Sequence, residues 1–299
     1  MAKIVFVHGV GQQLKAPAVL HAEFEPALIG GMELAGLDPA GGRPSVDCVF
    51  YGDLFRPKGR VLGPPTPLLS VEDLSEFERQ LLMDWWVEAA RTDDSVPGPD
   101  TPTLARSPKS LQTALRVLSG SKFFAGVAQR LMLSNLRQMR LYLTDDTVRA
   151  AVGERIAAAI ADDTRVIVGH SMGSVASYEA LCANSQWPVQ TFVTVGSPLG
   201  IRNLFFDQLR PAPMTARSLR PVGRWPGSVR TWTNIADRGD VVALVKDLRP
   251  LFGDAVTNIE IHNGAHAHDA RPYLTSADTG RVLLEALSAV ETGTSVAGE

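Results

Sequence analysis

The chain has 299 residues, of which 45% are hydrophobic and 20% charged, with a formal net charge of -3 at pH 7. This length and apolar content allow a large core, in one α/β domain with insertions or in a domain plus a cap, and the slight acidic excess argues against nucleic acid as a main partner. The two cysteines, Cys48 and Cys182, are too few for a disulfide framework and read as reduced, buried side chains.

The first predicted element is a buried strand at Lys3–Val7, which is apolar after its first residue. It leads into His8-Gly9-Val10-Gly11, and a helix is expected from Ala18 to Ala35. The two glycines have two explanations: they make a tight turn into the helix, or they expose the Val10 N–H as a donor to developing negative charge. Since the strand starts within two residues of Met1, we expect no cleavable targeting segment.

After a second strand at Val46–Tyr51, the chain leaves the core for a predicted helical insertion. Its first helix is expected to begin at Ser70, as an N-cap with Asp73 three residues on, and its third spans Ser121–Leu143. A turn-rich connector from Pro97 to Pro108 lies between them. The apolar faces of these helices either pack on each other and on the core, or line a substrate pocket. The pocket hypothesis selects six side chains: Leu81, Leu82, Trp85, Trp86, Leu131 and Met132.

The core resumes with a helix at Asp146–Ala161 and a short apolar strand at Arg165–Val168. The sequence Gly169-His170-Ser171-Met172-Gly173 follows, and then a helix at Ser174–Asn184. A serine between a strand and a helix, with glycines two residues before and after, is typical of a nucleophile elbow. The Met172 N–H at the start of the helix then points to the place where an oxyanion would form.

The HGVG loop after the first strand and the GHSMG elbow resemble the α/β-hydrolase superfamily, specifically its lipase- and esterase-like serine hydrolases. The resemblance implies an α/β-hydrolase fold, with a mostly parallel sheet flanked by helices and a reduced N-terminal edge. It divides the chain into a core of residues 1–57 and 144–299 and a helical cap or lid at 58–143. It assigns the nucleophile to Ser171 and the oxyanion hole to the amides of Val10 and Met172.

The family order places an acid and then a histidine after the serine. A strand at Val229–Asn234 precedes two acids, Asp237 and Asp240. We favour Asp240, because in the family the acid stands immediately before a small apolar pair, here Val241-Val242. Asp237 is then expected to shape the loop through hydrogen bonds to local backbone.

Three histidines follow the next strand, Ala255–Ile261. We favour His268 as the general base, with His266 as the alternative and His262 at the strand end. Three histidines close together could also bind zinc. No H-E-x-x-H helix and no cysteine cluster accompanies them, so we expect no metal.

A further strand at Val189–Val195 and a closing helix at Ser276–Val290 complete the predicted core. Residues 200–227 carry five arginines against one acid, Asp207. These arginines are either solvated or receive an anionic group of a ligand. They are Arg202, Arg210, Arg217, Arg220 and Arg224.

Together these features predict a serine hydrolase that cleaves carboxylic esters through an acyl-enzyme and without a cofactor. The apolar cap favours a lipid or another medium or long acyl ester, and a small-molecule ester is the other substrate class. An acyltransferase, a thioesterase, an amidase or a non-enzymatic binding module on the same fold are the alternatives. We expect a cytoplasmic protein with no nucleic-acid partner and with transient membrane contact through the cap. The sequence leaves the oligomeric state open.

Overall fold

A computed structural model describes residues 3–56, 70–99, 107–121, 129–215, 220–264 and 267–294, with side chains described as far as residue 289. Within these residues the main sheet has six strands, all parallel, in the order β2-β1-β3-β4-β7-β8. The strands are β1 Lys3–Val7, β2 Ser45–Val49, β3 Thr164–His170, β4 Thr191–Val195, β7 Thr231–Asp237 and β8 Val256–Ile261.

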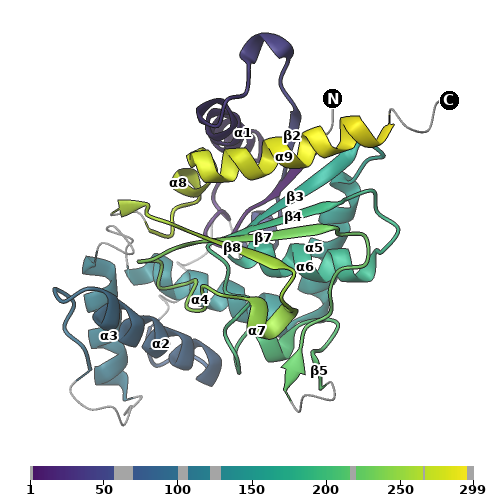
Figure 1. The fold of residues 1–299 in the computed structure, drawn as a ribbon. Helices are drawn as coiled ribbons and strands as arrows, with labels where there is room; N and C mark the ends of the chain where they lie inside the picture. The colour runs from purple at the N-terminus through teal and green to yellow at the C-terminus, as the bar shows by residue number, and fades with distance from the viewer. Residues whose placement is uncertain are drawn as a thin grey trace.

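Helices cover both faces of this sheet (Figure 1). In β1, Ile4 and Phe6 join the core under one set of helices, whereas Val5 and Val7 join the core on the opposite face. The first face carries α1 Pro17–Leu34, α8 Ala270–Thr275 and α9 Ala277–Thr294; the second carries α5 Asp146–Ala159 and α6 Met172–Ala183. The predicted α/β class, with a mostly parallel sheet flanked by helices, is confirmed.

The shorter elements lie in the connections between these strands and helices. They are the 3-10 turns Pro39–Gly41, Gly52–Phe55 and Phe206–Gln208, the two-residue strands β5 Met214–Thr215 and β6 Pro221–Val222, and α7 Arg249–Phe252. No described strand pairs with the outer side of β2, so β2 and β1 form this end of the sheet in the part of the chain that the structure describes.

The insertion between β2 and β3 contains α2 Glu76–Thr92, α3 Pro108–Gly120 and α4 Gln129–Thr144. The prediction that its first helix begins at Ser70 is wrong. Ser75 is the N-cap: its hydroxyl accepts the Glu78 N–H, and the Glu78 carboxylate accepts the Ser75 N–H, which completes a capping box. Asp73 instead closes a turn by accepting the Ser70 N–H. The third helix was predicted at Ser121–Leu143. Ser121 is instead the C-cap of α3, and the helix is described as α4 from Gln129. Residues 122–128 and most of the predicted connector lie outside the described part.

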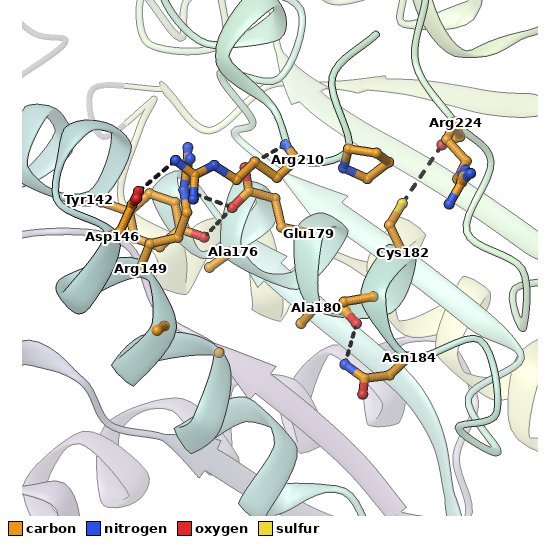
Figure 2. Close-up of a pocket in the computed structure, with 14 residues that line it drawn as sticks. Tyr142, Asp146, Arg149, Ala176, Glu179, Ala180, Cys182, Asn184, Arg210 and Arg224 are labelled. Atoms are coloured by element: carbon orange, nitrogen blue, oxygen red, sulfur yellow. Dashed lines mark hydrogen bonds and ion pairs between the residues drawn. The ribbon is translucent and has the colours of Figure 1, made fainter. Parts of the chain in front are cut away.

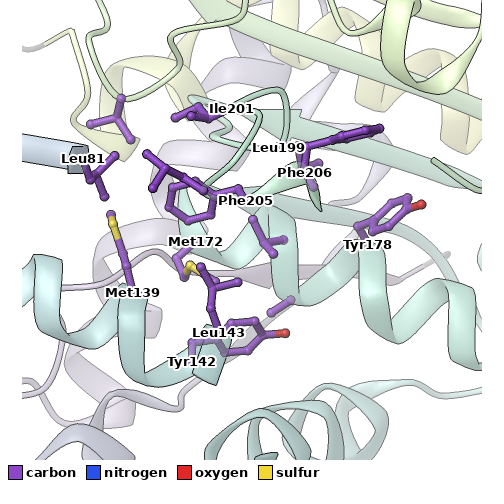
Figure 3. Close-up of a cluster of buried hydrophobic side chains, with 14 of the residues drawn as sticks. Leu81, Met139, Tyr142, Leu143, Met172, Tyr178, Leu199, Ile201, Phe205 and Phe206 are labelled. Carbon is purple, nitrogen blue, oxygen red and sulfur yellow. The ribbon is translucent and has the colours of Figure 1, made fainter. Parts of the chain in front are cut away.

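The insertion and the sheet share one hydrophobic cluster (Figure 3). Leu81 of α2 and Met139 and Leu143 of α4 are buried with Met172 at the start of α6. Phe205 and Phe206, from the loop after β4, pack into the same cluster. The insertion is therefore packed against the end of the sheet that carries the β3–α6 turn. Among the described helices, none is both long enough and apolar enough to cross a membrane.

Two adjacent glycines in α1 test the packing of α1 against α8 and α9. A Cβ atom on Gly31 would lie 2.2 Å from the Leu274 carbonyl oxygen, whereas a Cβ on Gly30 would meet nothing within 4 Å. We predict that Gly31→Ala lowers the free energy of unfolding by about 1–3 kcal/mol, because the helices must separate. The matched control Gly30→Ala should raise it by up to about 1 kcal/mol through helix propensity. Urea denaturation of both variants measures this, and equal shifts would contradict the helix packing.

Candidate active site

Ser171 occupies the sharp turn between β3 and α6. Its φ is 51° and its ψ is -127°, a backbone conformation that is strained for a residue with a side chain. The flanking glycines allow this turn to pack closely. A Cβ on Gly169 would lie 2.6 Å from Ser174 Cα, and one on Gly173 would lie 2.2 Å from the Val7 carbonyl oxygen. The Ser171 N–H donates to the Val195 carbonyl at 3.0 Å, so the turn is also tied to the end of β4.

The structure brings Ser171, His268 and Asp240 together in a hydrogen-bonded chain. Ser171 Oγ lies 3.0 Å from His268 Nε2, and His268 Nδ1 lies 2.8 Å from Asp240 Oδ2. The Asp240 carboxylate is inaccessible to solvent and also accepts the Tyr273 hydroxyl at 2.9 Å and the Val242 N–H at 2.8 Å. These donors hold the carboxylate in one orientation toward the imidazole.

The hydrogen bonds of Asp240 also determine its charge. Burial opposes its ionisation, but the neighbouring His268, Lys246 and the backbone N–H of Val242 outweigh burial and lower the pKa of Asp240 to about 2. Asp240 is therefore ionised at neutral pH, and an ionised carboxylate can only accept a hydrogen bond, so the Nδ1 of His268 carries the hydrogen and donates it to Asp240 Oδ2. His268 Nε2 is left free to accept a proton from Ser171.

Asp237 is as buried as Asp240, but its carboxylate binds backbone N–H groups of the neighbouring loops. Its carboxylate accepts the backbone N–H of Gly239 at 2.6 Å and that of Asn263, and its nearest histidine atom among the described contacts is His262 Nδ1 at 3.9 Å. The imidazole of His262 is exposed to solvent. His266 lies outside the described residues.

The loop after β1 is held in place from two sides. His8 is buried, and burial lowers its pKa to about 4, so its ring is neutral. The ring stacks on Tyr51 and its Nε2 accepts the Tyr51 N–H at 3.2 Å. On the other side, the Gly11 N–H donates to Gln138 Oε1 of α4 at 3.2 Å. Among the described residues, no loop or cap hydrogen bond uses the N–H of Val10 or of Met172.

A cavity of about 400 Å³ opens beside Ser171 and His268. Of the six side chains predicted to line a pocket, Trp85 and Met132 line this cavity. Leu81, Leu82 and Trp86 are buried in the shared hydrophobic cluster and Leu131 is half-buried, and these four do not line it. Residues that the sequence analysis did not select complete the lining: Gln12, Lys15, Glu23, Phe24, Asn135, Met139, His170, Val242, Asp269, Ala270 and Arg271, together with Val10.

Helical spacing contained a signal for part of this lining. Met132, Asn135 and Met139 follow one another at intervals of three and four residues and share one face of α4. A stripe of apolar residues predicts Met132 and Met139 on this face but not Asn135, because Asn135 is polar.

The described arginines of residues 200–227 do not line this cavity. Arg210 and Arg224 line a second cavity of about 440 Å³ beside α6, shown in Figure 2. Within it Glu179 accepts the Tyr142 hydroxyl at 2.8 Å and lies 3.2 Å from Arg149 Nε. Arg210 pairs with Asp146, Arg202 lies over the Phe206 ring, Arg220 is exposed, and Arg217 lies outside the described residues.

No group of three or more His, Cys, Asp or Glu side chains in the described ranges is arranged to hold a metal ion.

Comparisons with known proteins add little to this geometry. No protein-family model matches the chain, and no curated protein matches it. Among solved structures, the esterase domain of a Rhodothermus marinus protein is 12% identical to this chain, with a TM-score of 0.35. The match covers 94% of this chain and 84% of that one. At this TM-score the likeness assigns neither a family nor an activity.

His170, next to Ser171, makes a pH-dependent contribution to stability. Burial above all, and repulsion from His268 when that ring is protonated, lower the pKa of His170 to about 3, whereas an unfolded histidine titrates near 6.5. Between these values the unfolded chain binds the extra proton, so stability present at neutral pH is lost as the pH falls below about 6.5. His170 Nε2 lies 3.1 Å from the His268 carbonyl oxygen, and a glutamine can keep that contact without titrating.

We predict that His170→Gln loses less stability than the wild type when the pH is lowered from 7.5 to 5. The difference should be about 2 kcal/mol, the linkage contribution of one histidine over this interval. Urea unfolding at the two pH values measures it. Equal losses in both proteins would show that His170 does not titrate differently on folding.

Proposed function

We propose that this protein is a serine hydrolase of the α/β-hydrolase type that cleaves carboxylic esters. One observation carries the proposal: a serine on a strained strand-to-helix turn lies 3.0 Å from an imidazole whose other nitrogen lies 2.8 Å from a buried carboxylate. Ser171, His268 and Asp240 thus each have the hydrogen-bond partner that their roles in nucleophilic catalysis require.

In the proposed reaction His268 Nε2 removes the Ser171 proton as Oγ attacks the ester carbonyl carbon. The resulting imidazolium is stabilised by Asp240, which stays ionised. The carbonyl oxygen becomes an oxyanion, which accepts hydrogen bonds from the N–H groups of Val10 and Met172. The intermediate then collapses: the ester carbon–oxygen bond breaks as His268 gives its proton to the leaving oxygen, so the alcohol departs and the acyl group stays on Ser171. Water, activated by the same imidazole, hydrolyses the acyl-enzyme and restores Ser171.

The position of residues 8–11, the loop after β1 that we call the oxyanion loop, supports the roles of Val10 and Met172. A Cβ on Gly9 would lie 2.8 Å from Ser171 Cβ, so the loop after β1 lies directly against the elbow. Met172 is the first residue of α6, where the helix dipole favours negative charge. Preorganised donors of this kind are worth about 3–4 kcal/mol each in acyl transfer.

The lining of the cavity supports a substrate with an apolar portion. Trp85, Met132 and Met139 supply an apolar wall next to Ser171, from helices of the insertion. The insertion thereby acts as a cap over the proposed active site. We propose a small-molecule or lipid ester as the substrate, and transient membrane contact through the cap stays a prediction.

Hydrolysis of p-nitrophenyl esters from acetyl to palmitoyl tests the proposal. We expect turnover that Ser171→Ala abolishes, and a chain-length optimum set by the cavity of about 400 Å³. The two acids provide a matched pair of variants. Asp240→Asn should lower kcat by about 10³–10⁴-fold, because the imidazole loses its orienting carboxylate, whereas Asp237→Asn should change kcat less than about tenfold.

Two results would contradict the proposal. If Ser171→Ala turns the esters over as fast as the wild type, the measured activity does not come from this site. If Asp237→Asn reduces kcat as much as Asp240→Asn, the assignment of the acid is wrong. Ester aminolysis or alcoholysis products in place of the free acid would instead identify an acyltransferase.

A further inference from the structure

Two residues that line the active-site cavity have an amide oxygen with no hydrogen-bond donor among the described residues. Gln12 Oε1 and Asn135 Oδ1 are both hidden from solvent, and no described residue donates to either. Both residues line the cavity that contains Ser171 and His268. A buried acceptor without a donor is costly to the fold and uncommon in native proteins. A ligand group in the cavity can supply the missing donors when the two side-chain amides turn their oxygens toward it.

The two amides reach the cavity from different elements. Gln12 follows the oxyanion loop, whereas Asn135 is on α4, between Met132 and Met139 on the same helix face. Asn135 lies close to the loop as well, because a Cβ on Gly11 would be 3.1 Å from Asn135 Oδ1. The cap and the core therefore each contribute one acceptor near the proposed oxyanion hole.

A neighbouring amide on the same helix behaves differently. Gln138 uses both ends of its side chain: Oε1 accepts the Gly11 N–H at 3.2 Å, and Nε2 donates to Ser134 Oγ at 3.1 Å. Gln138 thus holds the loop in place and has a structural explanation. The oxygens of Gln12 and Asn135 have no such explanation within the described residues.

The charges around the cavity indicate a neutral ligand group. Lys15 pairs with Glu23, and Arg271 pairs with Asp269 at 2.6 Å. Asp240 is the partner of His268. Because these charged side chains already have opposite charges beside them, the cavity offers acceptors for a neutral donor rather than a free charge for an ion.

We propose that Gln12 and Asn135 form a polar binding site for a hydroxyl or amide N–H group of the substrate. The inference rests on the proposed ester hydrolysis and specifies its substrate class: esters that carry a hydrogen-bond donor a few atoms from the scissile carbonyl. Such a site rejects an analogue without the donor, because that analogue leaves the buried acceptors unpaired.

Matched pairs of esters test this on both sides of the scissile bond. On the acyl side, p-nitrophenyl 3-hydroxybutyrate is compared with p-nitrophenyl butyrate; on the alcohol side, 2-hydroxyethyl butyrate is compared with propyl butyrate. We expect the hydroxylated ester to have at least about tenfold higher kcat/KM in one pair. The variants Gln12→Met and Asn135→Leu, which keep side-chain size, should bring that ratio toward one. Asn184→Leu, at an amide outside this cavity, should keep the wild-type ratio.

The outcomes separate this inference from the proposed function. If the wild type hydrolyses both members of both pairs equally and Ser171→Ala hydrolyses neither, the polar site is wrong and the hydrolase proposal stands. If the preference exists but survives in both amide variants, other residues bind the donor and the assignment to Gln12 and Asn135 is overturned. If no ester is hydrolysed in a Ser171-dependent way, the proposed function fails, and the inference fails with it.

Discussion

The strained turn at Ser171 is the constraint on which the rest of the site depends. A serine with a φ of 51° is stable only when its surroundings fix the backbone on both sides. Here the Ser171 N–H is bonded to the end of β4, and Gly173 lies against the carbonyl end of β1. Three neighbouring strands and the start of α6 therefore hold one hydroxyl in place. The same contacts bring the loop after β1 against the serine, so the nucleophile and the proposed oxyanion donors are positioned together.

The second requirement is a carboxylate that stays charged inside the protein. Burying Asp240 is unfavourable unless hydrogen bonds and an opposite charge compensate for lost hydration. His268, Tyr273 and two backbone N–H groups provide that compensation. Tyr273 also accepts the Asp237 N–H at 2.7 Å, so one hydroxyl connects the two acids of the loop after β7. The loop after β7, which carries Asp240, and the loop after β8, which carries His268, are thus hydrogen-bonded to each other at the same end of the sheet as the turn at Ser171.

The sequence was sufficient for the parts of this arrangement that depend on local pattern. The six main strands lie within three residues of their predicted ends, because short apolar runs bounded by turn residues leave few alternatives. The true N-cap of α2 was also readable, since Ser75 and Glu78 have the spacing of a capping box, although Ser70 was preferred. Which insertion residues line the cavity could not be predicted in this way. Leu81, Trp85 and Met132 are all apolar at helical spacing, and only the packing of α2 and α4 on the core decides which of them face Ser171. Asn135 could not be predicted to line the cavity, because a single polar residue on an apolar helix face can equally point to solvent, and only the packed structure distinguishes the two.

The central claim is that Ser171 is an activated nucleophile, and covalent labelling tests it most directly. A fluorophosphonate reacts with a serine only where an adjacent base and oxyanion donors promote the attack. The folded protein should gain the mass of one adduct, peptide mapping should place it on Ser171, and urea-unfolded protein should gain none. An unlabelled folded protein, or an adduct on another serine with Ser171 unmodified, would contradict the claim.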